Sequence, residues 1–532
     1  MPADLIAKIR QYPKTAAFVL GSLSVLALPP HFWLPVLLVS FTGLLLLLQQ
    51  TEKPKEAFAF GYWFGFGYFA CGLSWIGNAL LIDAQTFGWL YPLVFLASGA
   101  FFGLFAAFPA WLASYFKNIY AKYLAFASLW VAFEWVRSFF LTGFPWNLLG
   151  TVLAFTPATM QLAAVIGTYG LSLLVIMISS APALALRQKD KIGLWSSLGL
   201  IIAGSLLIGG YGVFRLHRLG STEDGSIKVR IVQPAIPQTM KWSPTSLDDN
   251  INKYIAMSRT EGLEDVDFVI WGETASPFPL DYDDYYRQLV TNAIPEKGYL
   301  ITGLVRYEAD ADDRYQPLNS LFVMNKHGIV RGSYDKSHLV PFGEYIPLRR
   351  WLPLWIRPIT NTIANFKAGS GLKNIRIDDY PEFGALICYE IIFPAQVVNS
   401  KHKPDWLVNL TNDGWYGNSA GPYQHLAMAQ MRAVEEGITV VRVANTGVSA
   451  VIDRLGIIRT SLPLNHSGTV DTFLPQKLSA PTLYGKYSNF IPLILCFLNL
   501  TFEMVFLIGR INSAIQLRRW IYSPKGTRWL LS

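Results

Sequence analysis

The sequence has few cysteines and no metal-binding pattern. Its 532 residues include three cysteines, Cys71, Cys388 and Cys496, and no two of them form a C-x-x-C pair. This spacing indicates neither a disulfide framework nor a zinc cluster. The seven histidines show no ligand spacing such as H-E-x-x-H. We therefore expect no metal site, and we expect Cys71 and Cys496, which lie in apolar runs, to be small buried residues.

Charged residues are scarce as well, at 15 % of the chain, whereas 52 % of the residues are hydrophobic. A chain of this length exceeds one compact domain. The polar residues are concentrated in a middle section, and long uncharged runs lie on both sides of it. This distribution predicts a membrane part and a water-soluble part.

The uncharged runs predict eight membrane spans, since a helix needs about 20 apolar residues to cross the hydrocarbon core. The basic start resembles a signal peptide, but apolar character resumes after Pro29-Pro30, which favours two spans joined by a turn. The runs cover residues 15–50 (two spans), 57–82, 84–116, 123–140, 160–186, 192–214 and 487–508.

These spans predict three regions. We expect a transmembrane domain of seven helices over residues 1–214, an α/β domain over 215–486, and a last transmembrane helix with a tail over 487–532. Lysine and arginine are concentrated in the loops on one side of the predicted membrane, which is the cytoplasmic side by the positive-inside rule. Both termini are then inside and the α/β domain outside. The net charge of +8 reflects this topology, so nucleic-acid binding is not expected.

Two charged residues interrupt the predicted span 123–140. Glu134 and Arg137 lie three residues apart on one helical face, which favours an ion pair between them at the membrane edge. The loop 142–147 would follow at the outer interface. A contribution to a lipid-binding mouth is the alternative.

The middle section has the pattern of an α/β domain with a substantial sheet. A turn signal at residues 325–328 lies between two β-rich runs and predicts a hairpin. The expected strands cover residues 227–232, 268–271, 299–305, 321–324, 385–389, 406–410, 439–443 and 448–453, and the expected helix covers 422–436.

Three polar side chains lie at the ends of apolar runs in this section: Glu273, Lys336 and Cys388. A cysteine at its ordinary pKa is mostly protonated, so acyl chemistry needs a base and a positive neighbour. Glu273 could take the thiol proton, and Lys336 could stabilise the thiolate and then a tetrahedral oxyanion. Each residue alone also fits a simpler role, as a surface carboxylate, a solvated lysine or a buried cysteine.

The surrounding residues carry a family resemblance. W-G-E-T-A at 271–275, Y-D-K-x-H-L-V-P-F-G-E-Y at 334–345 and I-C-Y-E at 387–390 resemble the nitrilase (carbon–nitrogen hydrolase) superfamily with its Glu-Lys-Cys triad. The whole chain resembles the apolipoprotein N-acyltransferases of the Gram-negative inner membrane. The resemblance implies a nitrilase-like αββα sandwich in the periplasm and cytoplasmic termini.

The resemblance also implies a two-step acyl transfer. The Cys388 thiolate, deprotonated by Glu273, would take an acyl chain from a phospholipid, phosphatidylethanolamine being the usual family donor. The α-amino group of the diacylglyceryl-cysteine of an apolipoprotein would then attack this thioester, giving the triacylated lipoprotein. Lys336 would stabilise the oxyanion. The ester already carries the activation, so no cofactor is implied.

Supporting residues follow from the matching motifs. The resemblance implies that Glu344 orders the lysine amine or moves a proton, and that Tyr389 and Glu390 position the loop of the thiol. Asn319 and Trp242 match other positions that are functional in the family. Packing in the sheet or loops is the alternative for these residues.

The segment 349–357 places aromatic and apolar residues between arginines just after Glu344. We expect Trp351 and Trp355 to belong to a mobile lid that touches the membrane and binds lipid, with the arginines near headgroup phosphates. Ordinary core packing is the alternative.

Two other functions stay open. A membrane-tethered nitrilase-like amidase would hydrolyse the acyl-enzyme with water, and a non-catalytic membrane scaffold or transporter would only bind a partner. Eight spans exceed what a tether needs, and a binding module does not need a Glu-Lys-Cys set. The membrane part favours a monomer.

Overall fold

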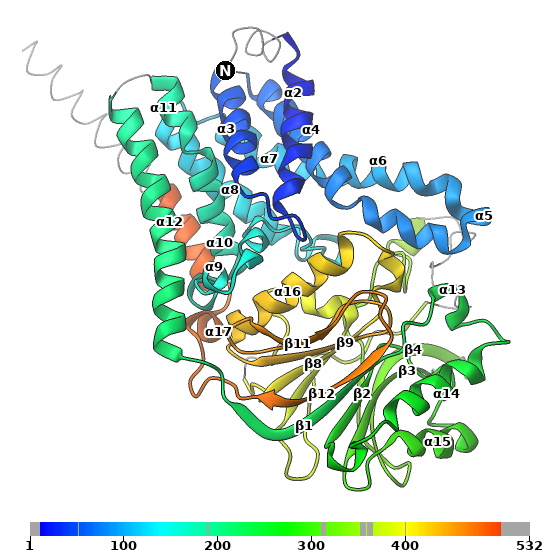
Figure 1. The fold of residues 1–532 in the computed structure, drawn as a ribbon. Coiled ribbons are helices and arrows are strands. Elements are labelled where there is room, and N and C mark those ends of the chain that lie inside the picture. Colours follow the sequence, from blue (N-terminus) through cyan, green and yellow to red (C-terminus); the bar gives the residue numbers. More distant parts are fainter. Residues whose placement is uncertain are drawn as a thin grey trace, which may run out of the picture.

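A group of helices packs against a two-sheet domain (Figure 1). The computed structural model describes residues 11–51, 53–188, 191–309, 315–351, 358, 365–399 and 401–501. The longer helices of the first part are α2 (Pro13–Ser24), α3 (Pro35–Gln50), α4 (Pro54–Gly72), α6 (Tyr91–Phe102), α7 (Leu104–Ala113), α8 (Ile119–Val136), α10 (Ala163–Ser180), α11 (Pro182–Gln188) and α12 (Lys191–Leu219). The short helices α5 (Ala84–Phe87) and α9 (Pro157–Met160) lie between them.

Proline and glycine shape this helical part. Proline occupies the first turn of α2, α3, α4 and α6, where its missing N–H costs no hydrogen bond. A Cβ added at Gly21 would lie 1.9 Å from the carbonyl oxygen of Phe64. Only glycine therefore allows α2 and α4 to approach this closely.

Three helical stretches in the described part of the chain are long and apolar enough to cross a membrane: Ser74–Ala113, Ala163–Leu186 and Lys191–Leu219. Shorter apolar helices cover Pro13–Ala27, Pro35–Gln50 and Phe490–Thr501. A membrane-associated protein is consistent with these helices, whereas the count of eight spans stays a prediction.

The predicted span 57–82 is not one helix. α4 ends at Gly72, and Ser74–Asp83 continues as a 3-10 helix. Two side chains of this segment contact the α/β domain: the Trp75 indole donates to the side-chain oxygen of Gln424 at 3.2 Å, and Asn78 donates to a backbone carbonyl at 2.8 Å. These polar contacts hold the 3-10 segment against the α/β domain.

The predicted ion pair between Glu134 and Arg137 is wrong: the structure records no salt bridge between these two side chains. Glu134 instead accepts from the backbone N–H of Leu149 at 2.9 Å. Arg137 donates to the carbonyl oxygens of Phe144 and Trp146 at 2.7 and 2.6 Å. Sequence spacing could not reveal these partners, because the loop folds back over the end of α8. Both charges therefore hold the loop 142–149 in place.

The α/β domain contains two six-stranded sheets. The first has the order β12 (Gly468–Pro475), β1 (Asp224–Gln233), β2 (Phe268–Trp271), β3 (Tyr299–Ala309), β4 (Tyr315–Asn325), β5 (Val330–Asp335). The second has the order β11 (Ile458–Leu462), β10 (Ser449–Ile452), β9 (Thr439–Ala444), β8 (Trp406–Thr411), β7 (Phe383–Ile387), β6 (Asn374–Ile375). Strands β1–β3 and β7–β9 pair in parallel, and the outer pairs are antiparallel.

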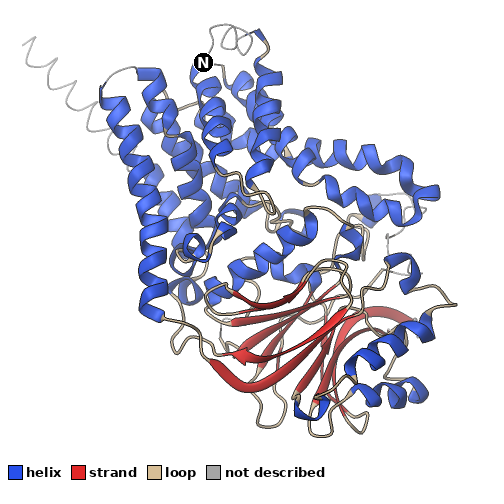
Figure 2. Cartoon of the chain, in the orientation of Figure 1, coloured by secondary structure: helices blue, strands red, loops and turns tan. Residues whose placement is uncertain are grey.

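The sheets pack face to face with helices outside, so the expected αββα sandwich is confirmed (Figure 2). Alternation along the strands builds the layers: Phe383, Ala385 and Ile387 of β7 face the other sheet, whereas Leu386 faces outward. Helices α14 (Leu247–Ser258) and α15 (Asp284–Val290) cover the first sheet, and α16 (Gly421–Glu436) covers the second on the side of the helical part.

The predicted hairpin is confirmed, because β4 and β5 pair antiparallel around the turn at 325–328. The predicted strand 385–389 ends earlier than expected, at Ile387. Cys388 opens a 3-10 turn instead, because its backbone φ of +52° cannot continue a strand.

Candidate active site

Strand β7 delivers Cys388 at its carboxyl end. The strand is buried along its whole length, and Cys388 itself is 5 % exposed. A φ of +52° is uncommon for a residue other than glycine, and such strain is concentrated at functional sites. The sharp turn places the thiol at the edge of the sheet instead of within it.

Glu390 fixes this turn against the end of β5. One carboxylate oxygen accepts from the backbone N–H of Ile387 at 2.7 Å. The other accepts from the N–H groups of Ser337 and His338 at 2.9 and 3.0 Å, and from the Tyr334 hydroxyl at 2.7 Å. One buried carboxylate thus joins the segment of the thiol to the segment of Lys336.

Four side chains form a glutamate–lysine cluster: Glu273, Asn319, Lys336 and Glu344. Lys336 Nζ lies 2.9 Å from Glu344 Oε1 and 3.5 Å from Glu273 Oε1. Asn319 donates to the same two oxygens, at 2.9 and 2.8 Å respectively. The structure therefore brings together two predicted triad residues and two predicted supporting residues, which come from four separate segments.

The charges of this cluster act on the thiol. Burial and the Glu273 carboxylate raise the pKa of Cys388 to about 12, and Lys336 opposes this rise. Burial disfavours the Lys336 ammonium, but Glu344 and Glu273 outweigh burial and keep its pKa above the ordinary value. The resting state is therefore a protonated thiol beside a charged lysine.

Lys241 is a site residue that the sequence reasoning missed. Its ammonium is buried and donates to the backbone oxygen of Glu273 at 2.9 Å and to the Thr274 hydroxyl at 2.7 Å. Burial lowers its pKa to about 8, although Glu273 and Cys388 act in the opposite direction. The available signal was a lysine between Met240 and Trp242 in α13 (Gln238–Lys241), a position that alone suggests a solvated side chain.

A second buried group, the arginine–histidine cluster, lies on the carbonyl side of Cys388 and consists of Asp413, His425 and Arg442. Arg442 Nη2 donates to both oxygens of Asp413, at 2.8 and 3.0 Å. His425 Nε2 lies 3.1 Å from the carbonyl oxygen of Cys388, and His425 Nδ1 lies 2.9 Å from both Asp413 Oδ1 and Arg442 Nη2.

Electrostatics keep this second cluster balanced. Burial and the Arg442 guanidinium lower the pKa of His425, so the imidazole is neutral. Burial disfavours the Asp413 carboxylate, but the Arg442 guanidinium outweighs burial and holds the pKa of Asp413 below its ordinary value. In the described residues, no group of three His, Cys, Asp or Glu side chains is arranged to hold a metal ion.

The loop of the helical part lies directly on the thiol turn. The Tyr389 hydroxyl donates to the carbonyl oxygen of Gly143 at 2.7 Å. His338 Nε2 donates to the carbonyl oxygen of Thr142 at 2.6 Å, and the hydroxyls of Thr142 and Tyr345 lie 2.7 Å apart. The candidate site thus lies where the helical part meets the α/β domain.

Two of the three predicted substrate-binding tryptophans, Trp242 and Trp351, lie outside the cluster. Trp242 is 44 % exposed and Trp351 is 73 % exposed, with the Arg350 guanidinium 5.5 Å from the Trp351 ring. The exposure of Trp351 excludes core packing for this residue. Trp355 lies outside the described residues, and the lid stays a prediction.

Comparison with known proteins covers both parts of the chain. Residues 20–181 match the family model of the apolipoprotein N-acyltransferase N-terminal domain, and residues 228–481 match that of the carbon-nitrogen hydrolases. A solved amidase from Nesterenkonia sp. is 16 % identical, with a TM-score of 0.36 over 48 % of this chain and 94 % of the amidase.

Two curated relatives extend over nearly the full length. A protein named apolipoprotein N-acyltransferase from Rickettsia typhi is 36 % identical and matches 90 % of this chain and 96 % of its own. A protein of the same name from Brucella melitensis is 37 % identical and matches 93 % of this chain and 95 % of its own. The resemblance expected from the sequence is confirmed. This chain belongs to the apolipoprotein N-acyltransferase family and is an acyltransferase with a carbon–nitrogen hydrolase domain.

Proposed function

We propose that this protein transfers an acyl chain from a phospholipid to the α-amino group of the diacylglyceryl-cysteine of an apolipoprotein, through a thioester on Cys388. One observation carries the proposal: the charges of Glu273 and Lys336 act on the buried Cys388 thiol, and the loop from the apolar helices contacts the next residue, Tyr389. Family membership supports lipoprotein N-acylation in general.

In the first step, Glu273 takes the thiol proton while the sulfur attacks the acyl carbonyl carbon. A general base is required, because a thiol with a pKa near 12 holds very little thiolate at neutral pH. Lys336 stabilises the oxyanion. The ester C–O bond then breaks, the leaving oxygen takes the proton from Glu273, and a lysophospholipid departs.

In the second step, the acceptor amine attacks the thioester carbon and gives its proton to Glu273. The C–S bond breaks, the triacylated lipoprotein leaves, and the sulfur regains a proton from Glu273. Glu344 keeps Lys336 in position through both steps, because it pairs with the ammonium. Asn319 keeps Glu273 in position, because it donates to the carboxylates of both Glu273 and Glu344.

Exclusion of water favours transfer over hydrolysis. Lys336 is 1 % exposed and Glu273 is 6 % exposed. A thioester survives in such a site until an amine arrives, because few water molecules reach it. Trp242 and Trp351, both exposed, would contact the acyl chains, as would Trp355.

The topology belongs to the same proposal. We place residues 1–214 and 487–532 in a bacterial inner membrane, with both termini in the cytoplasm, and residues 215–486 in the periplasm. Phosphatidylethanolamine is the proposed donor, no cofactor takes part, and the protein acts as a monomer.

Incubation with phosphatidylethanolamine vesicles and intact mass measurement tests the mechanism. We expect an acyl-sized adduct that hydroxylamine removes and that is missing from Cys388→Ala. Cys496→Ala is the matched control, since Cys496 is also buried but lies outside the site. An active wild type without the adduct would contradict the thioester, and release of free fatty acid would indicate a hydrolase.

A further inference from the structure

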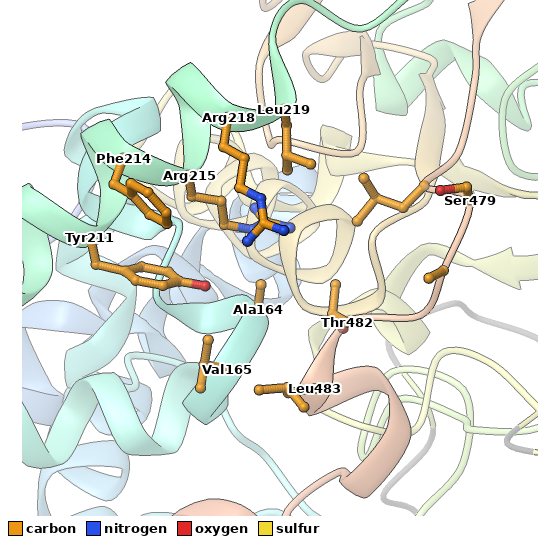
Figure 3. A pocket seen from close by; sticks show the side chains of 12 residues that line it. Ala164, Val165, Tyr211, Phe214, Arg215, Arg218, Leu219, Ser479, Thr482 and Leu483 are labelled. Carbon is orange, nitrogen blue, oxygen red and sulfur yellow. The ribbon is translucent and has the colours of Figure 1, made fainter.

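A second candidate binding site lies at the end of α12. It is a pocket of about 310 Å³ between the last turns of α12, the start of α10 and the segment before α17 (Leu483–Tyr487) (Figure 3). None of its lining residues belongs to the glutamate–lysine cluster. In Figure 1, α12 and α13, the helix that carries Lys241, lie at opposite sides of the molecule. The pocket is therefore separate from the candidate active site.

The lining is apolar with a positive end. Its polar side chains are two arginines, a tyrosine and two hydroxyl residues, and none of its twelve residues is acidic. The lining consists of Ala164, Val165, Tyr211, Phe214, Arg215, Arg218, Leu219, Leu478, Ser479, Ala480, Thr482 and Leu483. The pocket thus combines two positive charges, no carboxylate and apolar walls. Such a lining suits an anion that carries an apolar tail.

Arg215 is held in position without an acidic partner. It is 8 % exposed, and Nη1 donates to the side-chain oxygen of Gln161. That amide is itself fixed, because its nitrogen donates to the carbonyl oxygens of Pro157 and Leu455 at 2.7 and 2.8 Å. A guanidinium has five N–H donors, and within the described residues Arg215 makes no other side-chain hydrogen bond.

Arg218 extends from the next turn of α12 toward the same point (Figure 3). It forms no ion pair with a carboxylate in the described part of the chain. Two guanidinium groups that converge in this way match the geometry of a phosphate, which arginine binds with paired N–H donors.

The outward face of α12 fits the tail of such a ligand. Only 17 % of its apolar span is buried. Ile202, Leu206, Val213 and Phe214 are all more than half exposed. Acyl chains would lie along this face, while the pocket takes the polar end. Pockets for small ligands begin at about 300 Å³, which suits a phosphate with its glycerol.

We propose that this pocket binds the phosphate of a membrane phospholipid from the leaflet that faces the α/β domain, at a site distinct from the acyl-donor site. Arg215 and Arg218 hold the phosphate, and the acyl chains cover the apolar face of α12. Basic pockets beside membrane helices bind lipid headgroups in this manner.

Photo-cross-linking in nanodiscs of phosphatidylglycerol tests the site on the full chain. We would replace Phe214 by p-benzoylphenylalanine and, as the matched control, Ile202, which is equally exposed on the same helix (59 and 57 %). The phospholipid adduct at position 214 should fall about tenfold in Arg215→Gln/Arg218→Gln, the size expected for lost charge-assisted hydrogen bonds, and the adduct at position 202 should not change. An unchanged adduct at position 214 would overturn the proposal.

Two further experiments with the same cross-linking assay distinguish a phospholipid from other ligands. A diacylglycerol probe that labels position 214 as well as phosphatidylglycerol does would show that the phosphate is not recognised. Competition by millimolar inorganic phosphate would show a site for free phosphate instead of lipid, and both results would overturn the assignment. If the double variant fails to fold, Arg218→Gln replaces it, because Arg218 is exposed, with Arg259→Gln as the control.

Discussion

Two buried charged clusters surround Cys388, and they differ in the balance of positive and negative charge. The arginine–histidine cluster combines one carboxylate, one guanidinium and a neutral imidazole, and its charges cancel. The glutamate–lysine cluster sets two carboxylates around one ammonium. Both clusters are nearly inaccessible to water.

This difference in charge balance indicates a structural role for the arginine–histidine cluster and a catalytic role for the glutamate–lysine cluster. A balanced buried cluster has no spare basic group, and it holds the Cys388 backbone through His425. A cluster with one carboxylate in excess retains a proton acceptor, and its cost of burial is compensated by Lys336, Asn319 and the nearby Lys241. We infer that the first cluster determines stability and the second determines rate.

The largest expected effect is on the rate of acyl transfer. In Glu273→Gln, thioester formation should fall by about 10²- to 10⁴-fold, because the general base is lost while the side chain keeps its shape. The thermal unfolding midpoint should change little. Adduct formation measured by intact mass over time gives the rate.

The exposed Glu261→Gln is the control for this comparison. A Glu273→Gln rate within tenfold of wild type would contradict the assignment of Glu273 as the base.

The second prediction concerns stability. Arg442→Met should lower the free energy of unfolding by about 3–5 kcal/mol, because Asp413 is left buried without its partner. Arg331→Met, which breaks an exposed pair with Asp378, should cost less than about 1 kcal/mol. Denaturant titration in detergent measures both. Equal losses would remove the distinction between the two clusters.

The third prediction uses the ionisation of the thiol. Because burial and Glu273 raise the pKa of Cys388 to about 12, alkylation by iodoacetamide should keep increasing above pH 9. The contribution of Cys388 to the free energy of unfolding is fully present below its unfolded pKa near 9.0. It is lost as pH rises toward the folded pKa of about 12. In Glu273→Gln the pKa should fall, so alkylation at pH 8 becomes faster while acyl transfer becomes slower. A parallel change of both rates would speak against this mechanism.

The smallest expected effect concerns Lys241. Its folded pKa of about 8 lies below the ordinary 10.5, so the unfolded chain binds more protons between these values. The stability of the wild type relative to Lys241→Met should therefore rise with pH in this window, by roughly 1 kcal/mol per pH unit. Thermal unfolding from pH 7 to 10 measures it. A flat difference would show that Lys241 is not buried as a charged group.

Short motifs made the glutamate–lysine cluster predictable from the sequence. Glu273, Lys336, Glu344 and Cys388 each lie in a motif with characteristic neighbours, and alternation of apolar residues placed the strands that carry them. The sandwich followed from these strands, and the structure confirms it.

Partners that come from distant segments could not be predicted. Asp413, His425 and Arg442 come from three separate segments, so the sequence did not show that they meet; the packing of α16 on the second sheet joins them. The pairing of Glu134 with Arg137 failed for a related reason: helical spacing shows which side chains are neighbours, but not that a returning loop offers better partners.

Glu390 has a consequence for how the reactive centre arises. Its five donors come from the end of β5 in one sheet and the end of β7 in the other. Neither sheet alone can satisfy this carboxylate, so the lysine and the cysteine meet only after the two sheets have closed. A partly folded chain therefore carries an ordinary thiol. The thiol becomes reactive toward acyl esters only in chains whose two sheets have packed together.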